Sequence, residues 1–523
     1  MREHAGRTLL ALAGAICAIA AGPAAVAATP PGTSWTVYHG SAAGTGVAAP
    51  VTRVSTVARK WTSPTLDGQL YGEPLVWNGR VYVATQNDTV YALSAATGAV
   101  VWHAHVGTPV PASSLPCGNI TPTVGITGTP VIDPARGEIF ALADEMVNGK
   151  PAHILVGLNA TTGQREMTQN VDPPGVDTTA LLQRTGLNLT AGQVVLAMGG
   201  NFGDCAAYRG RVIAVPETGG QPRTFTIDAA AGQSQGAVWM GGAAPAVDSA
   251  GHVWVSVGNG SVHSSGERYD YSDSLLELSP TMRLLQYFAP RSWASDNAQD
   301  LDMSTGPVLL PSGQVLLAGK SRIAYLVNGA HLGGIGGAQA SLGSVCGSDI
   351  DGGSAVVGMT VYLPCLAGIV AVRATSSPPG LRLLWSSGTG GGPPIAAAGL
   401  IWTIGQNGTL YGLSPATGRV RQQAQIGGVA NHFPTPAVAG GLLLAPAATN
   451  VVAFPASGSS AVTPTPPPSA PTTGPTVPPA SQPQPPPSGG LPAAAIAGIV
   501  AGGLVLIGGA GWLLWRRRFS GHN

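Results

Sequence analysis

The residues best placed to do chemistry in this sequence are two aspartates separated by one residue. The stretch from Trp293 to Asp302 is rich in polar side chains and ends in Asp300-Leu301-Asp302. Carboxylate oxygens are preferred ligands of Ca²⁺ when several of them converge in the fold. Asp in a tight turn also caps the turn by accepting bonds from backbone amides. The sequence therefore leaves two roles open for Asp300 and Asp302, a metal-binding or catalytic role and a turn-capping role.

Other patterns that could carry chemistry are incomplete. The ten His are scattered without the spacing of metal ligands, which predicts no metal site. Residues 333–337 are Gly-rich, but a phosphate-binding loop needs a following Lys-Ser/Thr and a helix. No Gly-x-Ser-x-Gly precedes a predicted helix. We expect these segments to be loops on one face of the fold.

Four cysteines are predicted to form two disulfides. The chain has five Cys, and Cys17 lies in a segment that we expect to be removed on export. An even number of cysteines in an exported chain favours disulfides. Three pairings are possible, and chain position favours Cys117 with Cys205 and Cys346 with Cys365. Free or metal-binding thiols are the alternative, although no Cys-x-x-Cys spacing supports it.

Composition excludes two classes of protein. Only 9% of the 523 residues are charged and the formal net charge is +1. A nucleic-acid-binding protein would carry a basic patch or stripe, and charge-driven disorder needs a high net charge. The chain holds 75 Gly and 45 Pro, as expected of a fold with many tight turns. Its length exceeds that of most single domains, except for repeat folds.

Both ends of the chain are predicted to be targeting segments. Residues 1–27 have a positive start, an apolar stretch and a small-x-small site, which is typical of a secretory signal peptide. Residues 491–515 are apolar, uncharged and long enough to cross a bilayer as a helix. Arginines follow at once, and positive residues stay on the cytoplasmic side. We therefore expect residues 516–523 to be a cytoplasmic tail and the rest of the chain to lie outside the cell membrane.

The segment before the predicted membrane helix differs from the rest of the chain. Residues 457–490 are mostly Pro, Ser, Thr and Gln and have no periodicity. Such a tract forms an extended, polyproline-like spacer. We expect a stalk that lifts the folded domain, residues 33–456, away from the membrane.

The folded domain repeats one phrase. Its best copy runs from Gly72 to Trp102, with three short β-branched segments, an Ala-Thr-Gly turn and a last strand with Trp. Apolar and polar residues alternate, which predicts half-buried strands. A period of about 40–50 residues with four strands is the signature of a β-propeller. Copies begin near Gly72, Gly128, Thr179, Gly241, Ser304, Asp351, Gly391 and His432.

The repeats predict an all-β fold, an eight-bladed β-propeller. Seven blades is the alternative, if the fifth and sixth copies merge. The last copy has only three strands, and a lone strand, Thr56 to Trp61, precedes the first copy. We expect these two pieces to complete one blade and close the ring, which leaves no free sheet edge there.

The phrase Ala92 to Trp102 resembles the repeat of pyrroloquinoline quinone (PQQ) proteins, and weaker copies occur at Asn159 to Gly163 and Ser414 to Gly418. The resemblance covers the whole of residues 33–456 and points to the quinoprotein alcohol dehydrogenase-like superfamily, whose fold is an eight-bladed propeller. It implies that the fourth-strand tryptophans pack between blades. The matching residues here are Trp61, Trp102 and Trp385.

The resemblance leaves the activity open, because the superfamily holds both quinone enzymes and non-catalytic scaffolds. An enzyme of this kind implies PQQ, Ca²⁺ and a catalytic Asp on the axis, and many members carry a disulfide between adjacent cysteines. No adjacent Cys pair is present here. The stretch Trp293 to Asp302 is similar to the loop that holds the catalytic Asp, and Gly258-Asn259-Gly260 is similar to a turn upstream of it.

We therefore expect a membrane-anchored propeller that acts as a non-catalytic scaffold and binds an unknown protein or cell-wall partner through its loops. No cofactor is firmly implied. The alternatives are a PQQ- and calcium-dependent dehydrogenase, with Asp300 and Asp302 as its candidate residues, and a receptor for cell-wall polysaccharide. Acidic side chains that converge on the axis around a cavity of quinone size would favour the enzyme. An axis plugged by apolar side chains would exclude it.

Overall fold

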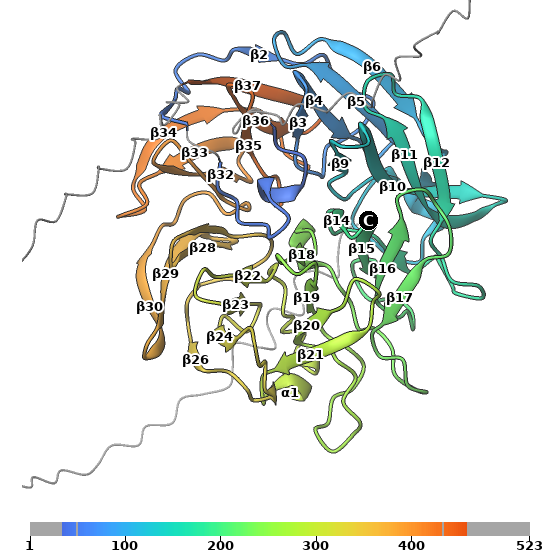
Figure 1. Cartoon of the computed structure of the whole chain (residues 1–523), viewed down its shortest axis with the longest axis vertical. Coiled ribbons are helices and arrows are strands. Elements are labelled where there is room, and N and C mark those ends of the chain that lie inside the picture. The colour runs from blue at the N-terminus through green and yellow to red at the C-terminus, as the bar shows by residue number, and fades with distance from the viewer. Residues whose placement is uncertain (1–33, 49–50, 431–432, 458–523) are drawn as a thin grey trace, which may run out of the picture. The chain divides into compact units, whose positions relative to one another are not determined.

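Eight antiparallel sheets form a closed ring in the computed structural model (Figure 1). The structure describes residues 34–48, 51–430 and 433–457. The predicted signal peptide, membrane helix and cytoplasmic tail, and the predicted stalk apart from its first residue, lie outside these ranges. Within the described ranges, no helix is long and apolar enough to cross a bilayer.

The first four blades follow each other along the chain. Blade 1 contains β3 (Leu75–Trp77), β4 (Arg80–Ala84), β5 (Thr89–Ser94) and β6 (Val100–His105). Blade 2 contains β9 (Val131–Asp133), β10 (Glu138–Val147), β11 (Lys150–Asn159) and β12 (Arg165–Asn170). Blade 3 contains β13 (Leu181–Leu182), β14 (Asn188–Thr190), β15 (Gln193–Gly200), β16 (Arg211–Pro216) and β17 (Arg223–Thr226). Blade 4 contains β18 (Ala246–Val247), β19 (Val253–Val257), β20 (Ser274–Leu278) and β21 (Leu284–Ala289).

The other four blades complete the ring. Blade 5 contains β22 (Val308–Leu309), β23 (Gln314–Ala318), β24 (Ala324–Asn328) and β26 (Ala340–Leu342). Blade 6 contains β27 (Ala355–Val357), β28 (Thr360–Cys365), β29 (Gly368–Ser376) and β30 (Pro379–Ser386). Blade 7 contains β31 (Ile395–Ala397), β32 (Leu400–Gly405), β33 (Thr409–Leu413) and β34 (Val420–Gln425). Blade 8 contains β35 (Ala437–Ala439), β36 (Leu442–Ala447), β37 (Asn450–Ser457), β1 (Arg53–Val54) and β2 (Trp61–Thr62).

Short elements lie between and within the blades. They are the strand pair β7 (Val110–Pro111) and β8 (Thr123–Val124), the 3₁₀ turns η1 (Tyr38–Gly40), η2 (Ala112–Ser114) and η3 (Met240–Gly242), and the helix α1 (Trp293–Asn297). Part of the Gly-rich run predicted as a loop is a strand, β25 (Gly334–Ile335), which pairs in parallel with β21. That prediction was wrong for these two residues.

Each predicted copy corresponds to one blade, so the prediction of eight blades is confirmed. The alternative of seven blades is wrong, because β22–β26 and β27–β30 form separate sheets. Ring closure also follows the prediction, since β1 and β2 both pair with β37 in blade 8 (Figure 1). The predicted strand Thr56 to Trp61 was wrong in its bounds, because of these residues only Trp61 is in a strand and β1 lies before them. The backbone N–H of Thr56 donates to the side chain of Gln422 in blade 7 instead of to β37, and Val57 is 94% exposed.

The inner strands are more buried than the alternation of the sequence predicts. All five residues of β19 and all five of β20 are buried. The outer strand β34, in contrast, alternates between more and less exposed residues. Each blade packs on a neighbour at both of its faces, so the middle strands have no solvent-facing side. The prediction of half-buried strands therefore holds only near the rim.

Tryptophans in outer strands link successive blades. Trp61 donates its indole N–H to the carbonyl oxygen of Ala95 in blade 1 at 3.0 Å. Trp102 donates in the same way to Ala160 in blade 2 at 3.2 Å, and Trp385 donates to Pro415 in blade 7 at 2.9 Å. Each ring lies against the Gly of the next Thr-Gly turn, at Gly98, Gly163 and Gly418. The contact between neighbouring blades is thus the same at three places in the ring.

The N-terminal segment 34–48, in blue, lies inside the ring (Figure 1). It forms backbone hydrogen bonds with strands of five blades, through Val76, Ile132, Val247, Val356 and Ala396. A sixth contact joins the side chain of Asn188 in blade 3 to the carbonyl oxygen of Ala42. We call this segment the axial plug. Its residues Tyr38 and His39 are buried, and their rings stack with centroids 4.2 Å apart.

Candidate cofactor site in the axial cavity

A cavity of about 580 Å³ is lined by loops that enter the ring from several blades. Because these loops belong to blades spread around the ring, the cavity lies on or near the propeller axis. Its polar lining residues are Asn119, Arg184, Asp204, Asp300, Asp302, Ser304, Lys320, Asp349 and Asp351. Its apolar lining residues are Ile120, Leu182, Phe202, Trp239, Leu366 and Phe433. A volume of this size lies within the roughly 300–1,000 Å³ typical of cofactor pockets.

Asp300 and Asp302 meet Lys320 at this cavity. The two aspartates precede β22, and Lys320 follows β23 in the same blade. The Lys320 ammonium lies 3.2 Å from Oδ1 of Asp300 and contacts Oδ2 of Asp302. The Asp302 side chain is 2% exposed, whereas that of Asp300 is 65% exposed. Burial acts to lower the pKa of Lys320, but the charges of Asp302 and Asp300 outweigh it and raise that pKa.

The Gly258-Asn259-Gly260 turn lies against the same two aspartates. The backbone N–H of Asn259 donates to Oδ1 of Asp302 at 2.6 Å, and its side-chain NH₂ donates to Oδ1 of Asp300 at 3.0 Å. The Oδ1 atom of Asn259 is buried and has no hydrogen-bond partner among the described residues. A Cβ atom on Gly258 would lie 2.7 Å from Oδ1 of Asp302. Glycine is therefore required for this close approach.

These contacts bear on both roles left open by the sequence. Asp302 accepts a backbone N–H, as a turn-capping residue does, and also contacts Lys320. Asp300 is held by two side chains, while most of its carboxylate faces solvent. The fold therefore brings Asn259 against Asp300 and Asp302, which follow it by 41 and 43 residues in the chain.

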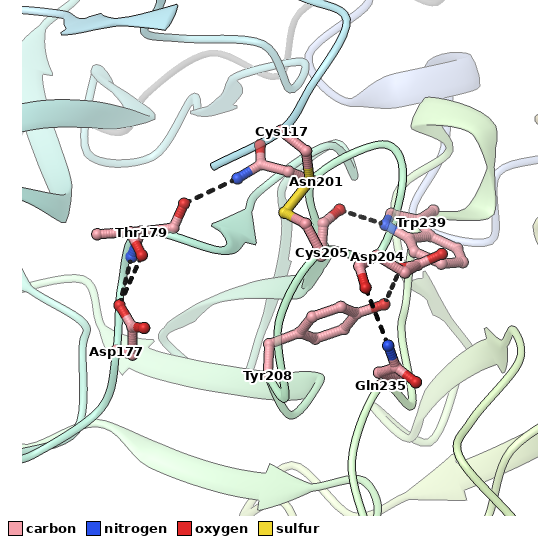
Figure 2. Close-up of a disulfide and its surroundings, with 10 residues drawn as sticks. Cys117, Asp177, Thr179, Asn201, Asp204, Cys205, Tyr208, Gln235 and Trp239 are labelled. Carbon is pink, nitrogen blue, oxygen red and sulfur yellow. Dashed lines mark hydrogen bonds between the residues drawn. A yellow bond between two sulfur atoms is a disulfide. The ribbon is translucent and has the colours of Figure 1, made fainter. Parts of the chain in front are cut away.

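Asp204 was not recognised from the sequence. It follows β15 and immediately precedes Cys205, whose disulfide to Cys117 joins loops of blade 3 and blade 1 (Figure 2). Tyr208 donates its hydroxyl to Oδ1 of Asp204 at 2.5 Å. Burial raises the pKa of Asp204, and the charges of Asp302 and Asp300 add to the rise.

Trp239 supplies an aromatic surface beside these polar groups. Its indole N–H donates to the carbonyl oxygen of Gly200 at 2.9 Å, which fixes the ring (Figure 2). A Cβ atom on Gly258 would lie 3.0 Å from the ring edge. No sequence pattern indicates Trp239, because it precedes η3 and lies outside the Thr-Gly-x-x-x-Trp phrase.

The second disulfide, Cys346 with Cys365, flanks the cavity on the other side. Both disulfides join the cysteines that the sequence favoured. Cys365 precedes the lining residue Leu366, and Asp349 and Asp351 lie between the two cysteines. Burial raises the pKa of Asp351 to about 7. Each disulfide thus restrains a loop that carries acidic cavity residues.

Charge in the cavity is unbalanced. Five aspartates line it, against Lys320 and Arg184. The Arg184 guanidinium lies over the rings of Tyr71 and Phe433, at 5.5 and 5.1 Å, and donates to the carbonyl oxygen of Thr127. Burial lowers the pKa of Arg184 to about 10. An added cation would offset the excess of carboxylates.

The chain is an eight-bladed β-propeller, and its fold is similar to that of PQQ-like repeat proteins. Residues 31–263 match the family model described as outer membrane protein assembly factor BamB. No curated protein sequence matches the chain.

Several solved structures share this fold. The quinohemoprotein alcohol dehydrogenase of Comamonas testosteroni is 15% identical with a TM-score of 0.61, over 81% of this chain and 80% of that one. The quinohemoprotein alcohol dehydrogenase ADHIIG of Pseudomonas putida HK5 is 14% identical with a TM-score of 0.60, over 82% and 81%. A europium-containing methanol dehydrogenase is 15% identical with a TM-score of 0.56, over 77% and 87%. At these identities, the likeness concerns the fold.

Proposed function

We propose that the axial cavity binds a quinone of the PQQ class together with a hard cation, and that the propeller is a quinoprotein dehydrogenase. The observation that carries this proposal is the convergence of Asn259, Asp300, Asp302 and Lys320 at a cavity of cofactor size. The sequence alone favours a non-catalytic scaffold. We expect acidic side chains around such a cavity to favour the enzyme and an axis plugged by apolar side chains to exclude it. The axial plug lies inside the ring, but none of its residues lines this cavity.

The types of donor atom suit a hard cation. Asp300 and Asp302 offer carboxylate oxygens, and the buried Oδ1 atom of Asn259 lacks a hydrogen-bond partner among the described residues. The carboxylates of Asp204, Asp300 and Asp302 do not all lie within ligand distance of one another, so Asp204 would act through its charge. Oxygen donors of this kind suit Ca²⁺ and other hard ions. A cation here would also reduce the repulsion that contributes to the raised pKa of Asp204.

The remaining lining fits a flat, anionic ring system. Trp239 offers an immobilised aromatic face, because its N–H is bonded to Gly200. Lys320 and Arg184 offer positive charge for the carboxylates of such a ring. Glycines at 199, 200 and 258 leave no room for side chains, since a Cβ atom at each would lie 3.0 Å or less from Trp239, Tyr208 or Asp302.

Within this proposal the aspartates have different tasks. A bound quinone would supply the acceptor for two electrons from a hydroxyl-bearing substrate. Asp300 is exposed and is the residue positioned to take the proton of that hydroxyl. Asp302 is buried between the Asn259 amide and Lys320, so it holds the site together and would be a ligand of a bound cation.

A non-catalytic scaffold remains the second candidate. The family model that matches residues 31–263 is described as an outer membrane protein assembly factor. Lys320 also partly neutralises Asp300 and Asp302 without any metal. In that case the polar groups of the cavity would only hold the loops of several blades together, and these loops would bind a protein or a cell-wall component.

For either candidate we propose an extracytoplasmic propeller on a membrane tether. This rests on the sequence patterns of residues 1–27, 457–490, 491–515 and 516–523. A quinone enzyme in this place would act on substrates outside the cell membrane.

The test is titration of the full-length chain, purified in detergent, with PQQ in the presence of Ca²⁺ or La³⁺. Binding is followed by calorimetry and by quenching of tryptophan fluorescence. We expect cation-dependent binding that weakens about 100-fold in Asp300→Asn and Asp204→Asn variants. Asp177→Asn, at an exposed turn outside the cavity, is the matched control. Absence of binding at high quinone concentration with both cations would leave the scaffold as the better account.

A further inference from the structure

Blade 4 holds a cluster of three ligand-type side chains that the proposed function does not use. Asp248 follows β18, His252 immediately precedes β19, and Glu277 lies on β20. One atom from each of them, a carboxylate oxygen or an imidazole nitrogen, lies within 4.8 Å of the other two. The sequence predicts no metal site from its histidines. Sequence spacing does not reveal this cluster, because Glu277 lies on a different strand from the turn that carries Asp248 and His252.

The distances suit a small divalent ion. His252 Nδ1 lies 2.6 Å from Oε1 of Glu277 and 3.7 Å from Oδ2 of Asp248. Around a tetrahedral zinc with bonds of about 2.1 Å, ligand atoms lie about 3.4 Å apart. The two distances from His252 Nδ1 therefore differ from the zinc geometry by less than an ångström. A metal would replace the proton that His252 now shares with Glu277.

Both carboxylates are already held. Oδ2 of Asp248, the proposed ligand atom, accepts the indole N–H of Trp254 at 2.9 Å and keeps a second lone pair for a metal. Oδ1 of Asp248 accepts the backbone N–H groups of Ala250 and His252, both at 2.9 Å. Oε2 of Glu277 accepts from the side chain of Gln286 at 2.5 Å. Second contacts of this kind orient ligands and add substantially to metal affinity. The two carboxylates are thus positioned before any ion arrives.

Charge and access also favour a cation. Within the described part of the chain, no Lys or Arg forms an ion pair with Asp248 or Glu277. The corresponding turn of blade 2 differs, because Arg136 pairs with Glu138 there. In blade 4 only the imidazole of His252 offsets two carboxylates. The His252 side chain is 34% exposed, which leaves room for water on a bound ion.

The cluster is separate from the axial cavity. His252 precedes the first residue of β19, and Gly258, beside Asp302, follows its last residue. A strand of this length spans roughly 20 Å between those two positions. The two sites therefore lie at opposite ends of one strand.

We propose that Asp248, His252 and Glu277 form a binding site for a divalent transition metal of the zinc type, with water completing the coordination. One nitrogen and two carboxylate oxygens favour such ions over Ca²⁺, which takes oxygen ligands. The ion would tie the turn before β19 to the neighbouring strand β20.

The experiment uses the full-length chain in detergent, stripped of metals with a chelator and titrated with ZnCl₂ by calorimetry. We expect a binding event that weakens at least about 100-fold in His252→Gln. Asp248→Asn keeps the size of the side chain and should weaken Zn²⁺ binding in the same direction. His263→Gln, at an exposed histidine of the same blade, is the matched control and should bind as the wild type does.

A second readout identifies the ligand. Cu²⁺ bound to the same site should give an electron paramagnetic resonance spectrum with nitrogen coupling, and the coupling should disappear in His252→Gln. Near-ultraviolet circular dichroism establishes that each variant is folded. The proposal is overturned if the wild type binds no Zn²⁺ at millimolar concentration. It is also overturned if folded His252→Gln and Asp248→Asn variants bind Zn²⁺ as tightly as the wild type.

Discussion

The Nζ atom of Lys320 lies 3.2 Å from Oδ1 of Asp300 and also contacts Oδ2 of Asp302. One ammonium therefore serves two carboxylates of very different exposure. Asp302 depends on it most, because its side chain is nearly inaccessible to water. Lys320 thus neutralises part of the negative charge of these two carboxylates, as a bound cation would also do.

Replacing Lys320 with Met should destabilise the protein and make its stability depend on calcium. Loss of the ammonium leaves Asp302 buried beside Asp300 without a partner charge, at a cost of about 2 kcal/mol. Ca²⁺ should restore part of that loss if the carboxylates can bind it. Thermal unfolding with and without Ca²⁺ measures both effects. Lys150→Met, at an exposed hairpin, controls for loss of a lysine, and equal calcium responses in the two variants would contradict the prediction.

Gly163→Ala should disrupt the contact between blades 1 and 2. The backbone φ at Gly163 is 76°, and a new Cβ would lie 2.7 Å from the ring of Trp102. Gly149 provides a matched control, since its φ is 75° but nothing lies within 4 Å of its Cβ position. We expect about 1 kcal/mol of destabilisation for Gly149→Ala and at least about 1 kcal/mol more for Gly163→Ala. Chemical denaturation compares them, and equal losses would mean that the Trp102 ring moves freely.

His153 should stabilise the protein in a pH-dependent way. Its Nδ1 lies 2.7 Å from Oδ1 of Asp172 and its Nε2 lies 3.5 Å from Oδ1 of Asp144. Burial opposes the charged form of His153, yet the charges of Asp144 and Asp172 raise its pKa to about 9. Because the folded pKa exceeds the unfolded value of about 6.5, the stabilisation is full below pH 6.5 and is lost as pH rises through 9.

The measurement is the difference in unfolding free energy between the wild type and His153→Gln across that range. We expect a gap of a few kcal/mol below pH 6.5 that closes toward pH 9. His263→Gln is the control for loss of an exposed histidine. A gap that stays constant with pH would show that His153 contributes packing rather than charge.

Removal of either disulfide should loosen an acidic loop of the axial cavity. Cys117 and Cys205 are 88 residues apart, and Cys346 and Cys365 are 19 apart. Loop entropy predicts losses of about 4–5 and about 3 kcal/mol for the paired Cys→Ser variants. Denaturant unfolding measures the losses, and hydrogen exchange should show faster exchange around Asp204 in the first variant and around Asp351 in the second. Unchanged exchange at both places would contradict a positioning role for the disulfides.

Most of the fold could be predicted from local patterns. The apolar segments mark each blade, Thr-Gly turns mark some of them, and the three-stranded last copy indicates how the ring closes. Burial could not be predicted equally well, because the alternation in a strand such as β19 is overridden by neighbours on both of its faces. The axial plug gave no signal, since residues 34–48 contain no repeat phrase.

The candidate site could be predicted only in part. Asp300 and Asp302 are close in sequence, so the stretch Trp293 to Asp302 alone identifies them as candidate residues. Lys320 reaches the two aspartates through strand pairing within blade 5, and packing of successive blades adds Asp204 and Trp239. The blade 4 cluster is likewise formed by the fold, because the pairing of β19 with β20 brings Glu277 to Asp248 and His252.

The N-terminal residues 34–62 contribute both the axial plug and two strands of the last blade. This arrangement affects how the chain can fold during synthesis. Ser63 and Asn450 are bonded to each other although they stand 387 residues apart in the chain. During synthesis, the first residues of the propeller cannot complete their strand pairing until the last ones have been made. Until then, every intermediate has an open strand edge that can pair with another chain. The ring can therefore close only after the whole propeller has been made. A truncated chain would keep an exposed strand edge that proteases and chaperones can bind.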